Sequence, residues 1–196
     1  MLLIVSTLGL SWLLMMAVHE SGHVLHGCWS GARLADLHLP VCGFSRTDFA
    51  ANPHPLFVAW GGPLWGCLFP LAVAGALRMA FASGRHTACA CYLAAWFAGF
   101  CLAANGSYLL GGAFLGGGGD DAGVILQSGG HVWQLIAFGL PTIAAGLYLW
   151  HGLGPHFGLG GARGKVDRKA AVGVAIALPC VILILLLLQK LGVLFP

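Results

Sequence analysis

Acidic residues are scarce in this chain of 196 residues, which contains only six of them and a single glutamate. Charged residues of both signs make up 8% of the sequence, whereas they make up about a quarter of a soluble domain. Together with a hydrophobic content of 59%, this excludes a water-soluble globular protein and a disordered chain. A net charge of +3 is also too sparse for a nucleic-acid-binding surface, so no nucleic acid partner is expected. The acids are Glu20, Asp36, Asp48, Asp120, Asp121 and Asp167.

Cys-x-x-Cys pairs are missing as well, although the chain contains seven cysteines. Without such a pair, nothing in the sequence supports a zinc ribbon or a thioredoxin-like redox site. Most of the cysteines lie inside apolar runs, and we therefore interpret them as small packing residues.

Five long apolar stretches are present instead, at residues 2–26, 55–82, 87–114, 132–153 and 170–194. Each reaches the length of about 20 residues that a helix needs to cross the hydrocarbon core of a bilayer. The fold class that we predict is an all-α, multi-pass integral membrane protein with about five transmembrane helices in contact with the lipid bilayer. The polar pair Asn105-Gly106 marks a candidate break in the third stretch.

Three polar connections separate these stretches, at residues 27–54, 115–130 and 154–169. In the first connection, Leu37 and Leu39 alternate with polar residues, and this pattern predicts a short strand or hairpin after the first helix. No internal repeat is detectable, and we predict a single membrane-embedded domain over residues 1–196.

The only glutamate lies in the sequence His19-Glu20-Ser21-Gly22-His23, near the end of the first stretch. Two histidines four positions apart project from one face of a helix, about 6 Å apart along its axis. At this spacing two imidazoles can bind one zinc ion, and the glutamate between them can act as general base on a water at the metal. We therefore predict His19 and His23 as metal ligands and Glu20 as the catalytic residue. In a membrane helix, such a cluster would be unfavourable without a partner.

A zinc site of this kind needs a third protein ligand and an open fourth position. A second glutamate is excluded because the chain has none. His26 shares the helix face of His19 and His23, but it lies about 10.5 Å from His19 along the helix axis, which is too far to share one ion. We interpret His26 as a residue that supports the site or faces a pore.

The five aspartates are then the main candidates for the third ligand, beside a distant histidine. Asp36, Asp48 and Asp167 lie in polar connections near basic residues, and we interpret them as solvated surface acids. Asp120 and Asp121 follow a run of four glycines, whose flexible backbone would let the chain fold back toward the membrane site. The alternative for this pair is a solvated loop. The residues alone leave the choice between the two aspartates open.

These motifs resemble the site-2 protease family of intramembrane zinc metalloproteases, over roughly residues 2–126. The His-Glu-x-x-His (HExxH) sequence matches the family's first motif, including the glycine before the second histidine. The sequence Gly61-Gly62-Pro63-Leu64 resembles the second motif. The run Asp121-Ala122-Gly123-Val124-Ile125-Leu126 resembles the third, in which an aspartate supplies a zinc ligand. The resemblance therefore favours Asp121 over Asp120, which stays as the alternative.

The resemblance implies a minimal member of this family without PDZ or CBS domains, with a catalytic core at residues 2–126 and additional helices at 131–196. It implies one catalytic Zn2+ ion, hydrolysis of peptide bonds in membrane protein substrates, and a location in a bacterial inner membrane. Asn105 is the candidate for a substrate-binding residue, with a helix-end cap as its alternative, and the hairpin is expected to pair with an extended substrate. Two family features are missing, namely a proline-rich stretch before the aspartate and an asparagine in the second motif.

Two other classes of function remain as alternatives. The first is a catalytically inactive membrane regulator that keeps the metal site; the missing family features favour it, and the intact Glu20 opposes it. The second is a metal-handling transporter, in which the three histidines of the first helix line a path. A transporter is expected to carry further acids or histidines on other helices, but nothing ionisable lies between His131 and His151, which flank the fourth stretch.

Overall fold

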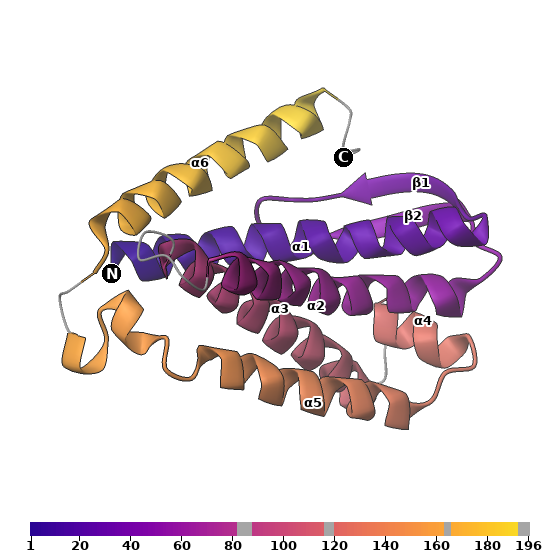
Figure 1. The fold of residues 1–196 in the computed structure, drawn as a ribbon. Coiled ribbons are helices and arrows are strands. Elements are labelled where there is room, and N and C mark those ends of the chain that lie inside the picture. The colour runs from indigo at the N-terminus through magenta and orange to yellow at the C-terminus, as the bar shows by residue number, and fades with distance from the viewer. Residues whose placement is uncertain (82–87, 116–119, 163–165, 192–196) are drawn as a thin grey trace.

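The computed structural model describes residues 1–81, 88–115, 120–162 and 166–191. Its elements follow the chain as a first long helix, a two-stranded hairpin, two long helices, a short helix, a long helix, two 3-10 turns and a last long helix (Figure 1). Their bounds are α1 Leu2–Ser30, β1 Arg33–His38, β2 Arg46–Ala51, α2 Pro55–Ala80, α3 Ala88–Leu115, α4 Asp121–Gln127, α5 Val132–Trp150, η2 Gly154–Phe157, η3 Gly160–Ala162 and α6 Arg168–Lys190.

Within the described ranges, five helices are long and apolar enough to cross a membrane, namely α1, α2, α3, α5 and α6. The prediction of an all-α, multi-pass membrane protein is therefore confirmed. The candidate break at Asn105-Gly106 is wrong, because α3 continues through both residues and the Asn105 side chain is hydrogen-bonded inside the protein. The predicted helix ends at residues 82, 87 and 194, like the glycine run at 116–119, lie outside the described residues.

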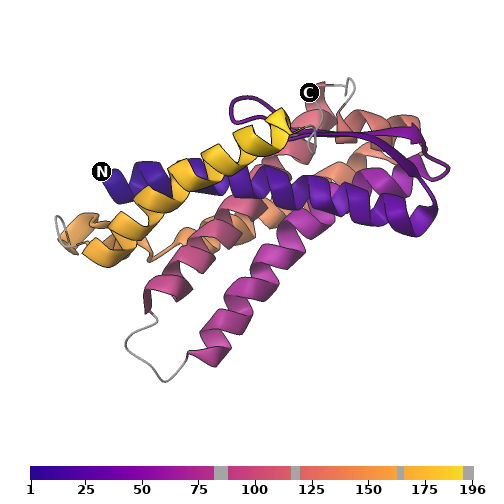
Figure 2. The ribbon, with the colours of Figure 1, turned by 90° about the horizontal axis from the view of Figure 1, so that it is seen from above.

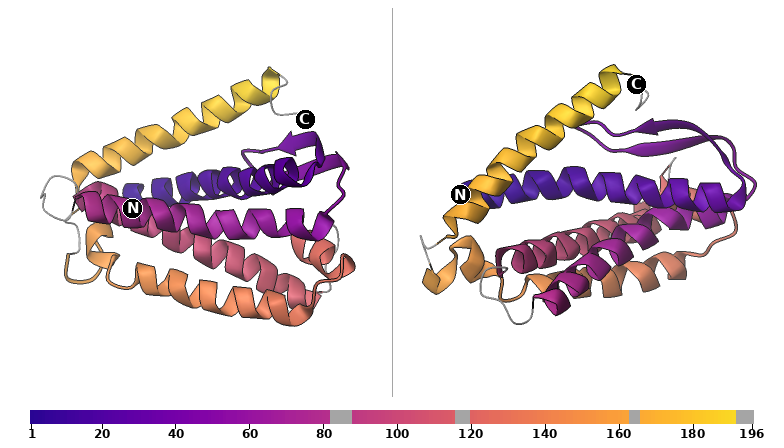
Figure 3. Two further views of the ribbon diagram at one scale, coloured as in Figure 1. Left: turned by 45° about the vertical axis from the view of Figure 1, so that its right-hand side comes forward. Right: turned by 45° about the horizontal axis from the view of Figure 1, so that its top comes forward.

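The long helices pack as neighbours in the order α6, α1, α2, α3 and α5, which Figure 1 shows from top to bottom. The left view of Figure 3 shows the same order from another side, with α5 and α6 as the outermost helices. The short helix α4 was not predicted, since residues 115–130 read as a polar connection. It forms because Ala122 and Ile125 are fully buried against Leu109 of α3 and Leu135 of α5. This apolar anchor also includes Ala59 of α2, so α4 lies beside the start of α2.

The predicted hairpin after the first helix is present. The chain leaves α1 at Gly31, which has a φ of 76° and so ends the helix in the left-handed conformation that glycine adopts readily. Strands β1 and β2 are antiparallel, with Leu37 opposite Thr47 and His38 opposite Arg46. Figure 2 shows both strands running alongside the C-terminal half of α1.

Aromatic side chains hold the hairpin against α1 near both ends of β2. The Phe44 ring meets the Trp12 ring edge to face, with 5.7 Å between the ring centroids. Phe49 lies over Gly27, where a Cβ atom would be 2.5 Å from its Cε1 atom. The Gln189 amide of α6 also donates a hydrogen bond of 3.1 Å to a backbone carbonyl of the hairpin segment. The residues between Phe44 and Phe49 are therefore held at a fixed distance from α1.

Helices α1 and α2 approach each other most closely at Gly22 and Gly61. A Cβ atom at Gly61 would collide with the Gly22 carbonyl oxygen and lie 2.9 Å from its carbonyl carbon. Small residues at a helix contact allow the backbones to approach in this way, and in a membrane such packing is a main source of helix association. The contact brings the backbone of α2 beside the histidines of α1.

We expect Gly61→Ala to lower the free energy of unfolding by about 1–3 kcal/mol, because the new methyl group would force two backbones apart. Gly75 of the same helix is the matched control, since a Cβ atom there meets no described atom within 4 Å. Gly75→Ala is expected to be neutral or slightly stabilising, because alanine is the better helix former. Reversible unfolding in detergent micelles measures both. Equal effects of the two variants would contradict the close contact.

Candidate metal centre

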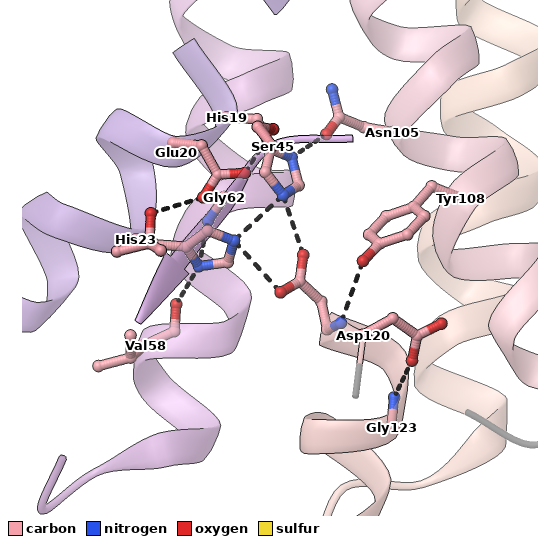
Figure 4. Close-up of polar contacts among 12 residues, drawn as sticks. His19, Glu20, His23, Ser45, Val58, Gly62, Asn105, Tyr108, Asp120 and Gly123 are labelled. Atoms are coloured by element: carbon pink, nitrogen blue, oxygen red, sulfur yellow. Dashed lines mark hydrogen bonds and ion pairs between the residues drawn. The ribbon is translucent and has the colours of Figure 1, made fainter. Parts of the chain in front are cut away.

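The HExxH residues of α1 face the interior of the protein. His19, Glu20 and His23 are 8%, 3% and 6% exposed. Helix α1 is unbroken through the motif, so the two histidines lie one turn apart on the same face. Their Nε2 atoms are 3.1 Å apart, and Figure 4 shows the two rings in contact.

Asp121, the first residue of α4, completes a cluster with these histidines. One carboxylate oxygen lies 2.9 Å from His19 Nε2, and the other lies 3.2 Å from His23 Nε2. The ligand atoms of the three residues all lie within 4.8 Å of one another, so this largely buried cluster can hold a metal ion.

The neighbouring Asp120 has a different partner. It is the N-cap of α4, and its Oδ1 atom accepts a hydrogen bond of 2.8 Å from the Gly123 backbone N–H (Figure 4). Aspartate is a preferred N-cap residue because its carboxylate satisfies an unpaired N–H of the first helical turn. This cap directs Asp120 to the helix and leaves Asp121 to face the histidines. Of the two candidates for the third ligand, the structure thus brings Asp121 into the cluster.

Opposing effects act on the proton affinity of Asp121. Burial raises the pKa of its carboxyl, whereas a charge on His23 and hydrogen bonds from both histidines lower it, and the resulting pKa lies below its usual range. Asp121 therefore enters the cluster as a carboxylate, which is the form that binds a metal.

The outer nitrogen of each histidine is hydrogen-bonded to an acceptor. His19 Nδ1 lies 2.6 Å from the Asn105 amide oxygen, and His23 Nδ1 lies 2.9 Å from the Val58 carbonyl oxygen. Because these oxygens only accept, both Nδ1 atoms donate a proton to them, and both Nε2 atoms face the cluster, where a metal ion would replace the protons that bond to Asp121. His23 Nδ1 also lies 3.3 Å from the Gly62 backbone N–H. We assign the hydrogen bond to the Val58 carbonyl oxygen, because that contact is shorter. Such partners fix the orientation of metal-binding histidines, so the donor set fits a metal ion.

Asn105 was predicted as a substrate-binding residue. The structure places it inside α3, 2% exposed, so the alternative of a helix-end cap is wrong. Its amide nitrogen donates to the Cys101 carbonyl oxygen at 2.8 Å. Its amide oxygen is thereby left for His19, and Figure 4 shows this second contact. In this geometry Asn105 orients a predicted ligand.

Tyr108, one turn further along α3, supports the cluster from another side. Its hydroxyl oxygen accepts a hydrogen bond of 3.2 Å from the Asp121 backbone N–H, and its ring meets the His19 ring edge to face (Figure 4). Sequence analysis missed this residue, because no pattern relates Tyr108 to an aspartate beyond the glycine run.

Gly62 of α2 lies directly beside the two Nε2 atoms. A Cβ atom at this position would collide with His23 Nε2 and lie 2.6 Å from His19 Nε2. The Gly-Gly-Pro sequence identified in α2 therefore has two separate functions. Gly61 allows the helices to approach, and Gly62 leaves room at the cluster.

We expect Gly62→Ala to weaken metal binding strongly, because its methyl group would occupy the space beside both donor atoms. Outer partners of metal ligands typically contribute 10- to 100-fold in affinity, and we expect a loss of at least about this size. Metal content after dialysis against competing chelators measures it, with Gly75→Ala as the control. Unchanged metal retention in Gly62→Ala would show that the ion binds elsewhere.

Glu20 contacts the hairpin instead of the cluster histidines. Its two carboxylate oxygens accept hydrogen bonds from the Ser45 hydroxyl at 2.6 Å and the Thr47 hydroxyl at 2.5 Å. Neither hydroxyl was predicted as a site residue. The alternation of Ser45, Thr47 and Phe49 was the available signal, but it does not say which face of the strand meets α1.

A cavity of about 830 Å3 joins these groups. This volume lies within the range of about 300–1,000 Å3 that is typical of ligand sites. One part of its wall is polar and contains the cluster, Glu20 and the hairpin hydroxyls, while the other part is apolar. The apolar wall includes Trp12, Met15, Met16, Phe44 and Phe49. The candidate metal centre therefore opens into a space that can receive a largely apolar ligand.

The remaining sequence candidates lie outside the cluster. His26 Nδ1 lies 2.7 Å from the Phe57 carbonyl oxygen, and its ring stacks on the Phe57 ring. Asp48 is exposed and pairs with Arg46 at 2.7 Å, and Asp167 is an exposed N-cap of α6, as expected for surface acids. Asp36 is only partly exposed and lies 3.9 Å from the Arg46 guanidinium.

Comparisons of the chain with protein-family models, with curated proteins and with solved structures found no match. The class of protein that the fold and the cluster define is therefore a multi-pass membrane protein with a buried His19-His23-Asp121 site that can hold a metal ion.

Proposed function

We propose that the protein is a zinc metalloendopeptidase that hydrolyses peptide bonds of membrane-embedded protein substrates, as in regulated intramembrane proteolysis. The observation that supports this best is the convergence of the His19, His23 and Asp121 donor atoms in a cavity that Glu20 also lines. The pair of histidines would not by itself suggest hydrolysis, and a single carboxylate would not do so either. Their combination on a membrane-spanning helix supports a hydrolase that works within the bilayer.

Zinc is the metal that we propose for this donor set. Two imidazole nitrogens and one carboxylate oxygen form a typical ligand set for catalytic zinc, which keeps a further coordination position open. When bound, zinc polarises a carbonyl oxygen and lowers the pKa of water toward neutrality. His19, His23 and Asp121 would hold the ion, while Asn105 and Val58 orient the two imidazoles.

Glu20 is the residue that moves the proton. Its carboxylate accepts a proton from the water that attacks the peptide carbonyl carbon, and it then donates that proton to the leaving amine nitrogen. The peptide C–N bond breaks, and the products are a carboxylate and an amine. Because Glu20 is the only glutamate in the chain, no second glutamate can perform this transfer.

The position of the cavity supports a substrate in the membrane. Its wall comes from α1, α2 and α3 together with the hairpin and the start of α4. A peptide bond in a membrane helix becomes accessible only if the helix unwinds locally and its freed backbone groups find new partners. Strand β2, which lines the cavity, offers such partners. The resemblance to the site-2 protease family is the basis for proposing a bacterial inner membrane as the location.

Metal removal tests this proposal in reconstituted lipid vesicles. The purified protein is incubated with single-span membrane proteins before and after treatment with a zinc chelator, and then after addition of one equivalent of Zn2+. We expect one tightly held zinc per chain, loss of cleavage in the chelated protein and recovery with zinc. Cleavage that persists without metal would contradict the proposal. Weak, exchangeable metal that crosses the vesicle membrane would favour a transporter instead.

A further inference from the structure

We propose that Ser45 and Thr47 of the hairpin are positioning residues that hold the Glu20 carboxylate in its reactive orientation, so that the hairpin forms part of the catalytic apparatus. This inference deepens the proposed function and rests on it. The hydroxyl groups of Ser45 and Thr47 belong to none of the three sequence motifs described above. Its basis is their contact with the only glutamate.

Each hydroxyl binds a different oxygen of the same carboxylate. Ser45 Oγ donates to Glu20 Oε1 at 2.6 Å, and Thr47 Oγ1 donates to Glu20 Oε2 at 2.5 Å. Distances of about 2.5–2.7 Å are typical of hydrogen bonds from a hydroxyl to an ionised carboxylate, which are stronger than bonds between neutral groups. A carboxylate oxygen can accept two hydrogen bonds, so each oxygen keeps one site for a water proton.

The alternation of side chains along β2 aims these hydroxyls at α1. Ser45, Thr47 and Phe49 are partly buried, whereas Arg46 and Asp48 between them are exposed and pair with each other. Successive side chains of a strand point to opposite faces, so Thr47 and Phe49 of β2 share one face, and Ser45, immediately before the strand, also contacts α1. The contact to Glu20 is therefore built into the register of the strand.

Contacts on both sides of the pair keep the two hydroxyls in place. Phe44, immediately before Ser45, packs on Trp12, and Phe49, two residues after Thr47, packs over Gly27. Both partners belong to α1, the helix that carries Glu20. These two aromatic contacts with α1 do not involve the carboxylate itself, and the one at Phe49 is the closer, because Phe44 is 78% exposed.

Restriction of Glu20 is useful because its side chain is long and rotates about three bonds. A general base must lie within hydrogen-bond distance of the proton that it removes, and a base that samples other rotamers is less often in that position. With both oxygens held, the carboxylate stays in the cavity next to the metal cluster. Substrate that packs against β2 would then contact the same strand that orients the base.

Kinetic comparison of hairpin variants tests the proposal in lipid vesicles with wild-type protein as reference. We expect the double variant Ser45→Ala, Thr47→Val to lower kcat by about 10- to 100-fold, with little change in KM and unchanged zinc content. Thr47→Ser keeps a hydroxyl and is expected to retain most of the activity. Gly75→Ala in α2, where a Cβ atom meets no described atom within 4 Å, is the control and should behave as wild type.

Hydrogen–deuterium exchange gives a readout that does not depend on cleavage. If Glu20 and the hairpin hold each other, both Glu20→Ala and the double hairpin variant will increase amide exchange at residues 45–51, while Gly75→Ala will not. A double variant with wild-type kcat and wild-type exchange would overturn the proposal. So would a faster double variant, since the hydroxyls would then hold Glu20 away from the reaction. If wild-type protein cleaves nothing, the proposed function fails, and exchange alone decides whether the hydroxyls hold Glu20.

Discussion

Glu20→Gln is expected to abolish peptide cleavage while leaving the bound metal in place. Glutamine has nearly the same shape as glutamate but cannot accept the proton of the attacking water. Removal of a general base typically costs about 10²- to 10⁴-fold in rate, and here the chain has no second glutamate to replace it. Metal retention is expected because the cluster consists of other residues, His19, His23 and Asp121. Fragment analysis in lipid vesicles and metal content of the purified protein measure the two effects.

His26→Asn is a suitable control for this experiment. His26 lies on the same helix as the cluster histidines, and its Nδ1 contact to the Phe57 carbonyl oxygen can be reproduced by an asparagine amide. We expect this variant to keep both zinc and cleavage. If Glu20→Gln cleaves substrate at the wild-type rate, the proposed mechanism is contradicted. A different result would favour the transporter. If His26→Asn loses the metal while His19→Asn retains it, the histidines line a path for metal ions and do not form a fixed site.

Asp121→Asn is expected to lower metal affinity by more than about 100-fold, whereas Asp120→Asn is expected to leave it unchanged. Asparagine at position 121 removes the negative charge and the carboxylate oxygens that lie 2.9 and 3.2 Å from the two histidines. The loss should exceed the 10- to 100-fold effect typical of outer partners, because Asp121 is proposed as a direct ligand. Titration of the metal-free proteins with Zn2+ against a competing chelator measures the difference.

The two aspartates form a matched pair for this test. Asparagine is as good an N-cap as aspartate, so Asp120→Asn keeps the hydrogen bond to Gly123 and the start of α4. Circular dichroism and unfolding of both variants would show that the fold is retained. Loss of metal in Asp120→Asn with normal binding in Asp121→Asn would reverse the assignment.

The membrane helices could be predicted from composition because the bilayer imposes a simple requirement on length and polarity. The five stretches read from the sequence correspond to α1, α2, α3, α5 and α6, with bounds that differ by a few residues. The hairpin was also predictable, since alternation at Leu37 and Leu39 is a local pattern. Helix α4 was not, because its seven residues form only through contacts with Leu109 and Leu135, far away in the sequence.

Some residues of the candidate site were also predictable from the sequence, and others were not. His19, Glu20 and His23 belong to one short motif whose helical spacing alone predicts their geometry. Asp120 and Asp121 are adjacent, and a shift of one residue at the start of a helix turns the side chain by about 100°. Only the cap at Asp120 and the apolar anchor of α4 decide which of them faces the histidines. Ser45 and Thr47 reach the site through packing of the hairpin on α1, and their alternation with Phe49 does not by itself say which face of the strand meets that helix.

The separation of the ligands along the chain has a consequence for biosynthesis. His23 and Asp121 are 98 positions apart (121 − 23) and belong to α1 and α4. A ribosome that adds about 5–20 residues per second needs roughly 5–20 s to synthesise this interval. During that time the histidines of α1 lack their carboxylate partner, and the HExxH helix cannot form the complete site. The nascent chain therefore cannot assemble this cluster until Asp121 has been made, and the proposed cleavage of membrane helices would be absent before then.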